Sequence, residues 1–175
     1  MLAWQTGKRP AGGHGLWDRS YEDRGERGND MLFKHILIPT DGSELSLKAV
    51  EHGLALAKVT GAKVTALTVQ PPMVDFVVEG VTITVTEAER AQMAREFGHR
   101  LDSARTAAQA HGIDLATLQV EDREPWRAII QVAKEKGVDL IVMASHGRRG
   151  VSALVLGSET QKLLTHSTIP VLVYR

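Results

Sequence analysis

The sequence predicts an α/β fold: a single doubly wound layer on a five-stranded parallel sheet, with strand order 3-2-1-4-5 and helices on both faces. From Met31 onward, short apolar segments of strand character alternate with longer segments that carry apolar residues at helical spacing. The strand segments are almost continuously apolar, as expected for parallel strands buried on both faces. Right-handed crossovers between such strands produce the doubly wound arrangement. The length of 175 residues fits one domain.

The first thirty residues differ from the rest of the chain. They are rich in glycine and polar residues and show neither helical nor strand periodicity, so we predict that residues 1–30 form a disordered N-terminal extension. Met31 begins the first strongly patterned segment and is therefore a candidate for the true initiator. An alternative interpretation gives Trp4 and Trp17 a docking role. The α/β domain is predicted to span residues 31–175.

The first predicted strand, helix and second strand follow one another closely. Residues 33–39 form a short apolar strand that ends at Pro39. Ser43 is a suitable N-cap for the helix, and Gly61 a suitable residue to end it. Residues 62–69 form the second strand. The apolar face of the helix carries Leu47, Val50, Leu54 and Ala57.

The segment after the second strand is ambiguous. Residues 73–85 are compatible with a hairpin that turns at Gly80 or with a long loop. Thr86 and Glu89 then have the spacing of a capping box, which marks the start of a helix. This helix is predicted to run without a break to His111.

The remaining elements alternate in the same way. Pro125 suits the first turn of a helix, and the face around Trp126 is predicted to pack on the sheet. The predicted order is a strand over 113–120, a helix from Pro125 to Gly137, a strand over 138–143, a helix beginning near Ser158, and a strand over 170–174.

The strand order predicts where a ligand binds. In doubly wound sheets, ligands bind beyond the carboxyl ends of the strands, at the point where the strand order reverses. Here the reversal lies between the first and fourth parallel strands, so the residues that follow these two strands should meet in one crevice. They are Pro39, Thr40 and Asp41 after the first strand, and Ala144, Ser145, His146 and Gly147 after the other.

The residue types at this crevice indicate a nucleotide. Gly147 and Gly157 allow the backbone to approach a ligand closely. Ser158 lies at the start of a helix, where free N–H groups and the helix dipole favour phosphate, and Arg148 adds positive charge. Asp41 has the wrong sign for phosphate and suits a ribose hydroxyl, a base amino group or a metal ion.

The chain resembles the universal stress protein family in four segments: MLFKHILIPTDGSELS, VDLIVMASHGRRG, LGSET and IPVLVYR. The resemblance extends from residue 31 to residue 175. The nucleotide-binding branch of that family carries the motif Gly-x2-Gly-x9-Gly-Ser/Thr. Gly147, Gly157 and Ser158 match the motif, whereas Ala144 replaces its first glycine and lacks the freedom of glycine at positive φ.

The resemblance implies an ATP-binding regulatory protein of the stress response, with ATP held together with Mg or Mn. It implies that Asp41 binds the ribose or the adenine side, and that the backbone of Val69 contacts adenine. Gly157 and Ser158 would hold the phosphates. The complete implied site is Pro39, Thr40, Asp41, Val69, Met143, Ala144, His146, Gly147, Arg148, Gly150, Gly157, Ser158, Glu159 and Thr160. The resemblance also implies a homodimer formed through the last strand, Pro170–Arg175, which has the character of a pairing edge.

Plainer interpretations of the same residues stay open. Asp41 and Ser158 can act only as helix caps, and Gly147 and Gly150 only as turn glycines. Arg148 and its neighbour Arg149 can be solvated loop charges. Thr40 can be a simple strand-end residue. A further residue, His146, is either a phosphate contact or general base, or a group that hydrogen-bonds the loop; the second role is favoured.

Composition excludes several classes of protein. The chain has no Cys, which excludes disulfide scaffolds, thiol nucleophiles and cysteine-bound zinc. Its 21 basic and 21 acidic residues balance, which argues against a nucleic-acid binder. No apolar run is long enough for a membrane span or for a signal peptide. The sequence therefore predicts a soluble, cytoplasmic protein without a nucleic-acid or membrane partner.

Motifs of other nucleotide and hydrolase folds are absent. There is no P-loop, no Gly-x-Gly-x-x-Gly after the first strand, no Gly-x-Ser-x-Gly elbow and no His-Glu-x-x-His. A nucleotide-free dimeric interaction protein stays open because of Ala144. A slow Mg-dependent ATPase, using Asp41 with a metal and His146 to orient water, also stays open. No dedicated catalytic base is visible, so true catalysis is disfavoured.

Overall fold

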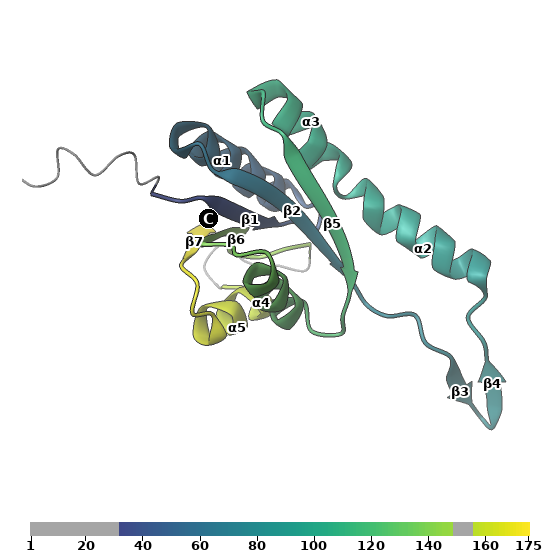
Figure 1. Ribbon diagram of the computed structural model, residues 1–175. Coiled ribbons are helices and arrows are strands. Elements are labelled where there is room, and N and C mark those ends of the chain that lie inside the picture. The colour runs from purple at the N-terminus through teal and green to yellow at the C-terminus, as the bar shows by residue number, and fades with distance from the viewer. Residues whose placement is uncertain (1–31, 149–155) are drawn as a thin grey trace, which may run out of the picture. The chain divides into compact units, whose positions relative to one another are not determined.

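We analysed a computed structural model that describes residues 32–148 and 156–175 (Figure 1). The elements follow in the order β1 (His35–Pro39), α1 (Glu44–Thr60), β2 (Lys63–Gln70), β3 (Phe76–Val78), β4 (Val81–Ile83), α2 (Glu87–His99), α3 (Asp102–His111), β5 (Leu115–Glu121), α4 (Pro125–Glu135), β6 (Leu140–Ala144), α5 (Ser158–His166) and β7 (Val171–Tyr174). The interpretations of residues 1–30, Met31, Arg149 and Gly150 lie outside the described residues.

The predicted sheet is confirmed. Five parallel strands pair in the order β5-β2-β1-β6-β7, which is the expected order 3-2-1-4-5 once the short β3 and β4 are set aside. β1 lies in the centre, between β2 and β6, so the strand order reverses beside it. Helices α1 and α3 cover one face, while α4 and α5 cover the other (Figure 1). The fold therefore places the carboxyl ends of β1 and β6 next to each other.

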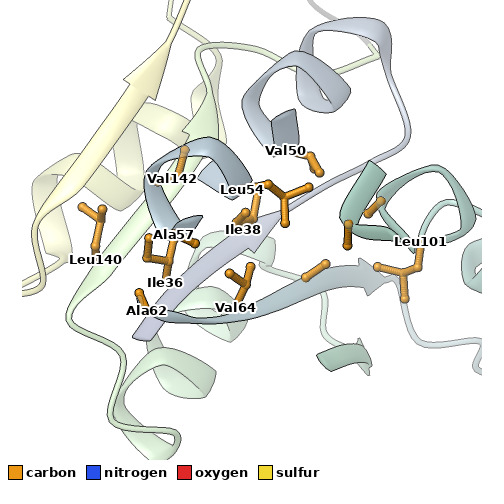
Figure 2. Close-up of a cluster of buried hydrophobic side chains, with 13 residues drawn as sticks. Ile36, Ile38, Val50, Leu54, Ala57, Ala62, Val64, Leu101, Leu140 and Val142 are labelled. Carbon is orange, nitrogen blue, oxygen red and sulfur yellow. The ribbon is translucent and has the colours of Figure 1, made fainter. Parts of the chain in front are cut away.

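The core is divided into two layers by the alternation of side chains along β1. Ile36 and Ile38 point into a cluster under α1 and α3, where Val50 and Leu54 join them (Figure 2). Leu37 points to the opposite face and packs beneath α4 and α5. All three β1 side chains are fully buried. This two-sided burial explains why the strands read as continuous apolar segments.

Helix α1 begins and ends as its sequence predicts. The Ser43 hydroxyl accepts a hydrogen bond from the Ser46 backbone N–H at 3.3 Å and caps the first turn. Gly61 ends the helix in the left-handed conformation, with φ of 71°, and its N–H bonds the Ala57 carbonyl. These two caps fix the length of α1 and so the position of the turn between β1 and α1.

We expect Gly53→Ala to destabilise the protein, although alanine is the better helix former. A Cβ at position 53 of α1 would lie 2.5 Å from Cδ1 of Ile38, in the closed core. Overpacking costs about 1–3 kcal/mol, against a helix-propensity gain of up to about 1 kcal/mol. The free energy of unfolding, measured with urea, should therefore fall by about 1–2 kcal/mol. Lys58→Ala, at an exposed α1 position, is the matched control. A Gly53→Ala protein as stable as wild type would show that Ile38 moves away at no cost.

The single helix predicted over residues 86–111 is wrong, because the structure divides it into α2 and α3. At the break, the N–H groups of Arg100 and Leu101 bond the carbonyls three residues earlier, of Phe97 and Gly98, which tightens the chain. Leu101 is then only 2% exposed and packs in the core, whereas Arg100 lies over the Phe97 ring at 3.5 Å. The break thus places Leu101 in the core and leaves Arg100 outside it, against the Phe97 ring.

Residues 73–85, for which the sequence left a hairpin and a long loop open, form the hairpin. Strands β3 and β4 pair antiparallel, with Val78 opposite Val81. The two turn residues, Glu79 and Gly80, both have positive φ, 51° and 81°, as a type I′ hairpin turn requires.

The capping box at the start of α2 is also confirmed, with reciprocal bonds between Thr86 and Glu89. Within the described residues, no helix is long and apolar enough to cross a membrane.

Candidate functional site

The site lies where β1 and β6 end. The backbone of Thr40 continues the pairing with β2 through its N–H, which bonds the Leu67 carbonyl at 2.8 Å. The backbone of Ser145 does the same on the other side, bonding the Tyr174 carbonyl at 2.7 Å. Beyond Thr40 and Ser145, both segments of the chain turn away from the sheet. The predicted crevice is therefore framed by residues from opposite halves of the sequence.

Asp41 joins these two turns. One carboxylate oxygen accepts the Ser43 backbone N–H at 3.0 Å, and the other accepts the Arg148 backbone N–H at 2.7 Å. The second bond connects residues 107 positions apart and holds the loop after β6 against the loop after β1. Asp41 is therefore not the cap of α1, which is Ser43, but a bridge between the two sides of the crevice.

Hydrogen bonding sets the charge state of Asp41. Burial is the largest single influence and opposes the charged form, but hydrogen bonds from Ser43, from the Arg148 backbone and from Ser46 together outweigh it. The pKa of the Asp41 carboxyl therefore lies below its ordinary value. At neutral pH the bridge is a carboxylate that accepts two backbone N–H groups.

The bridge should stabilise the fold in a pH-dependent manner. A lowered folded-state pKa means that the ionised carboxylate of Asp41 contributes stability above the unfolded pKa, about 3.9. This contribution is lost as the pH falls through the lower, folded-state pKa. We expect Asp41→Asn to unfold more easily than wild type at pH 7, and the difference to shrink at a strongly acidic pH, as the pH falls through the folded-state pKa. Denaturant unfolding at both pH values measures it, and a difference independent of pH would contradict the charged bridge.

The bridge between Asp41 and Arg148 requires a glycine at position 147, because the Asp41 carboxylate lies against its backbone. A Cβ at this position would collide with the Asp41 carboxylate, so only glycine leaves room for the contact. The need is for space rather than for a left-handed backbone, since Gly147 does not have a positive φ. Gly42, on the other turn, does have one, at 75°. Glycine therefore serves a different purpose on each side of the crevice.

Gly157 packs against the segment that follows β6, less tightly than Gly147 packs against Asp41. Its N–H bonds the Ser145 carbonyl at 2.8 Å, and a Cβ there would approach backbone atoms of His146 and Ser145 at 3.2 and 3.3 Å. Gly157 is also the N-cap of α5, and no side chain caps the helix. The interpretation of Ser158 as the N-cap is wrong: Ser158 is the first helical residue, and its side chain is exposed.

The other residues at the start of α5 use their side chains within the protein. The Thr160 hydroxyl is buried and donates to the Ala144 carbonyl at 3.1 Å. The Glu159 carboxylate accepts the Trp126 backbone N–H at 3.0 Å, at the start of α4. Both side-chain contacts thus position α5.

Three further site residues are strand residues. Met143 is 7% exposed and packs in the core beneath α4. Val69 lies two residues past Leu67, the β2 residue that pairs with the last residue of β1, Pro39, so Val69 extends beyond the end of β1. Ala144 is extended in β6 opposite Tyr174. The position filled by Ala144 therefore does not need the positive φ that glycine would provide.

His146 bonds its own neighbour. Its Nδ1 lies 3.1 Å from the Ser145 hydroxyl, which agrees with a role in ordering the loop. The Thr40 hydroxyl is likewise engaged, at 2.9 Å from the Ser46 hydroxyl in a buried contact that ties the turn to α1. Neither contact indicates a catalytic base. Both help to hold the two turns in place.

A polar cavity of about 260 Å³ adjoins the bridge, and of its lining residues only Asp41 and Arg148 were predicted from the sequence. The break between α2 and α3 brings Arg100 beside Gly42, and its guanidinium faces the same space as Arg148. Burial, followed by the positive charge of Arg148, lowers the pKa of Arg100. The cavity is lined by Asp41, Gly42, Glu96, His99, Arg100, Ser103 and Arg148.

The described residues offer no ready-made metal centre. Across 32–148 and 156–175, no three His, Asp or Glu side chains gather at metal-binding spacing. Each oxygen of Asp41 accepts one N–H group and keeps a further lone pair. One carboxylate is, however, too few protein ligands for a divalent ion on its own.

The fold and the crevice together define the class of protein. It is a single doubly wound α/β domain in which a glycine-containing loop closes on an acidic side chain where the strand order reverses. The chain belongs to the universal stress protein family, whose model matches residues 32–175.

Individual relatives agree with this assignment. The chain is 32% identical to universal stress protein MJ0531 of Methanocaldococcus jannaschii, over 85% of this chain and 86% of that protein. It is 33% identical to universal stress protein YxiE of Bacillus subtilis, over 82% of this chain and all of that protein. Among solved structures, MJ0577 superposes with a TM-score of 0.64 at 26% identity, covering 81% of this chain and 94% of the other. UspA from Lactobacillus plantarum gives 0.63 at 24% identity, over 81% and 97% of the two chains.

Proposed function

We propose that this protein binds an adenine nucleotide, ATP, at the crevice between β1 and β6 and acts as a regulatory protein of the stress response. The observation that carries the proposal is the Asp41–Arg148 bridge, which brings a carboxylate and a glycine loop to the point where strand order reverses. The site combines a negatively charged carboxylate with the positive end of a helix dipole. Asp41 suits the ribose or the base, and the start of α5 suits phosphate.

The backbone at α5 supports the phosphate assignment. Gly157 caps the helix without a side chain, so the first turn of α5 is not shielded by a capping group. Both glycines are held at positions where a methyl group would meet the wall of the crevice. A nucleotide could thus lie against the backbone of Gly147 on one side and of Gly157 and Ser158 on the other. The implied contacts of Arg148 and Val69 complete the proposed site.

Solved structures of similar fold have been described with adenine nucleotides. A universal stress protein in complex with cAMP has a TM-score of 0.63 at 24% identity, and one from Archaeoglobus fulgidus in complex with dAMP has 0.59 at 15%. At these identities the likeness concerns the fold. They support the proposal only in that this sheet architecture has room for such a ligand.

The bridge also supports a regulatory role. A ligand that enters between the two turns changes the surroundings of Asp41 and of the Arg148 backbone, and so the loop after β6. A partner protein could bind that loop in one of its two states, with or without nucleotide. The alternatives of a nucleotide-free interaction protein and of a slow Mg-dependent ATPase have no specific observation in their favour. A cytoplasmic location and the domain limits 31–175 belong to the same proposal.

A homodimer through β7 is part of the proposal. Among the strands of the described residues, β7 pairs with β6 alone and is an edge strand of the sheet, and Leu172 on it is 43% exposed. Antiparallel pairing with the same strand of a second copy would cover this edge.

The direct test is to identify what the purified protein carries. The full chain is denatured, the polypeptide is removed, and the released small molecules are identified by mass spectrometry. We expect ATP in near-stoichiometric amount from wild type and much less from Asp41→Ala. Equal amounts of nucleotide from the two proteins would place the nucleotide elsewhere, and no nucleotide from wild type would favour the nucleotide-free alternative.

A further inference from the structure

Two arginine side chains line the polar cavity beside the Asp41–Arg148 bridge. Arg100 comes from the break between α2 and α3 (Figure 1), and Arg148 comes from the loop after β6, so the cavity joins segments that are far apart in the sequence. Its volume of about 260 Å³ leaves space for a small polar group of a ligand. Arg100 has no part in the contacts proposed above for the nucleotide.

The guanidinium group of Arg100 is held in place by packing. Its central carbon lies 3.5 Å from the centroid of the Phe97 ring, and Phe97 is itself buried. The methylene stem of Arg100 lies against Gly42, in the turn after β1. Stacking on an aromatic ring orients a guanidinium group without using any of its five N–H donors. The position of Arg100 is therefore set while its donors are left for a ligand.

The acidic and basic residues of the cavity differ in how far their hydrogen bonds are satisfied. Both oxygens of Asp41 accept backbone N–H groups, and one oxygen of Glu96 accepts the Gln92 side-chain amide at 3.3 Å. By contrast, neither guanidinium group makes a hydrogen bond or an ion pair with any residue that the structure describes. The cavity therefore has a surplus of donors, although its two arginines and two carboxylates balance in charge. The positive charge of Arg148 also opposes that of Arg100, so an anionic group between them would relieve the repulsion.

Asp41 connects this cavity to the proposed nucleotide site. It lines the cavity and also lies at the end of β1, where the proposed function gives it a ribose hydroxyl. In dinucleotide-binding folds, a carboxylate binds the ribose 2′-hydroxyl, and an arginine nearby accommodates a phosphate on the same ribose. Here a carboxylate and two arginines line one cavity. A phosphate on one ribose oxygen would reach the arginines while the adjacent hydroxyl donates to Asp41.

We propose that the cavity is a phosphate subsite, and that the protein prefers an adenine nucleotide with a phosphate on the 2′ or 3′ oxygen of its ribose. This inference rests on the proposed function, because it needs the ribose beside Asp41. Hydrogen bonds from guanidinium groups to phosphate are charge-assisted and stronger than neutral ones. One such bond is worth about a 10- to 100-fold change in affinity. The start of α5 stays available for the 5′ phosphates, so the ligand is held on both sides of its ribose.

The test compares ligands that differ only by the ribose phosphate. AMP, adenosine 2′,5′-bisphosphate and adenosine 3′,5′-bisphosphate are each titrated into the nucleotide-free full chain in a calorimeter. We expect at least one bisphosphate to bind about tenfold or more tightly than AMP. If both bisphosphates bind no better than AMP while ATP binds, the subsite is wrong and the proposed function stands. If no adenine nucleotide binds, ATP included, the proposed function fails and the subsite fails with it.

Substitutions of the arginines then locate the phosphate. Arg100→Gln keeps the Cβ and Cγ atoms that lie against Gly42 and removes the guanidinium group, so the ratio of the AMP and bisphosphate dissociation constants should fall to about one. Because the ratio compares two ligands on the same protein, a general loss of stability does not change it. Arg148→Gln, at an exposed position, should lower the ratio as well. Arg95→Gln replaces an exposed arginine of α2 outside the cavity and should keep the wild-type ratio. A wild-type ratio in Arg100→Gln, or an equal fall in Arg95→Gln, would overturn the assignment.

Discussion

Asp41→Ala is expected to lower the affinity for Mg–ATP by about 10- to 100-fold, because a hydrogen bond to a charged group contributes about 1.5–3 kcal/mol. The carboxylate accepts the backbone N–H groups of Ser43 and Arg148, and alanine accepts neither. The loop after β6 then loses its connection to the loop after β1, so a ligand would have to order both. Isothermal titration calorimetry of the two proteins measures the difference.

Two further variants separate the bridge from a general effect of charge. Asp114→Ala removes an exposed carboxylate near the amino end of β5, away from the crevice, and should bind as wild type does. Asp41→Asn has a single acceptor oxygen, so one of the two N–H groups loses its partner. Its affinity should fall between those of wild type and Asp41→Ala. If Asp114→Ala weakens binding as much as Asp41→Ala, net charge and not the bridge governs affinity.

Gly147→Ala is expected to weaken nucleotide binding by a similar factor, about 10- to 100-fold, because it breaks the same bridge from the other side. Its methyl group would occupy the position of the Asp41 carboxylate, which must then move away from the Arg148 N–H. Gly98→Ala is the control: a Cβ there would meet only the Gln119 side chain, at an ordinary distance of 3.5 Å. Calorimetry should find Gly98→Ala unchanged in affinity.

The losses of binding free energy caused by Asp41→Ala and Gly147→Ala should not add. If Asp41 and Gly147 act through one contact, the double variant loses about as much affinity as either single variant, and the double-mutant cycle gives a large coupling energy. If each residue instead meets the nucleotide separately, the losses in free energy add. Additive losses would contradict the bridge as the organising contact of the site.

Much of this fold follows from patterns that are local in the sequence. The strands are apolar along their length because both faces of the sheet are covered, so β1 and β6 are recognisable without any partner. The caps at Ser43 and Gly61 act within one turn of α1, and the hairpin turn at Gly80 needs only its own backbone. The order of the strands follows from the handedness of the crossovers.

The features that escaped prediction depend on contacts between distant segments. The break at Arg100 brings Leu101 into the core. Its one local signal, Gly98, weakens a helix but does not by itself show that the helix is interrupted. The residues that this break brings to the cavity beside Asp41 were therefore missed. Ser158 resembles an N-cap in sequence, but Gly157 takes that position because it bonds Ser145 across the crevice.

The orientation of the side chains at the start of α5 also depends on contacts with distant segments, so it could not be predicted from the sequence. A motif indicates that Glu159 and Thr160 lie near the proposed nucleotide, but it does not tell which way they point. Their partners, the Trp126 backbone N–H and the Ala144 carbonyl, come from α4 and β6. Motif proximity and side-chain contact are therefore different predictions, and only the first could be made from the sequence.

The central claim, that the crevice between β1 and β6 binds ATP, is tested most directly by titrating Mg–ATP into nucleotide-free full-length protein in a calorimeter. We predict one site per chain with a dissociation constant in the micromolar range, about −8 kcal/mol, and binding about 10- to 100-fold weaker in Asp41→Ala. No heat of binding up to millimolar ATP, or binding that Asp41→Ala leaves intact, would contradict it.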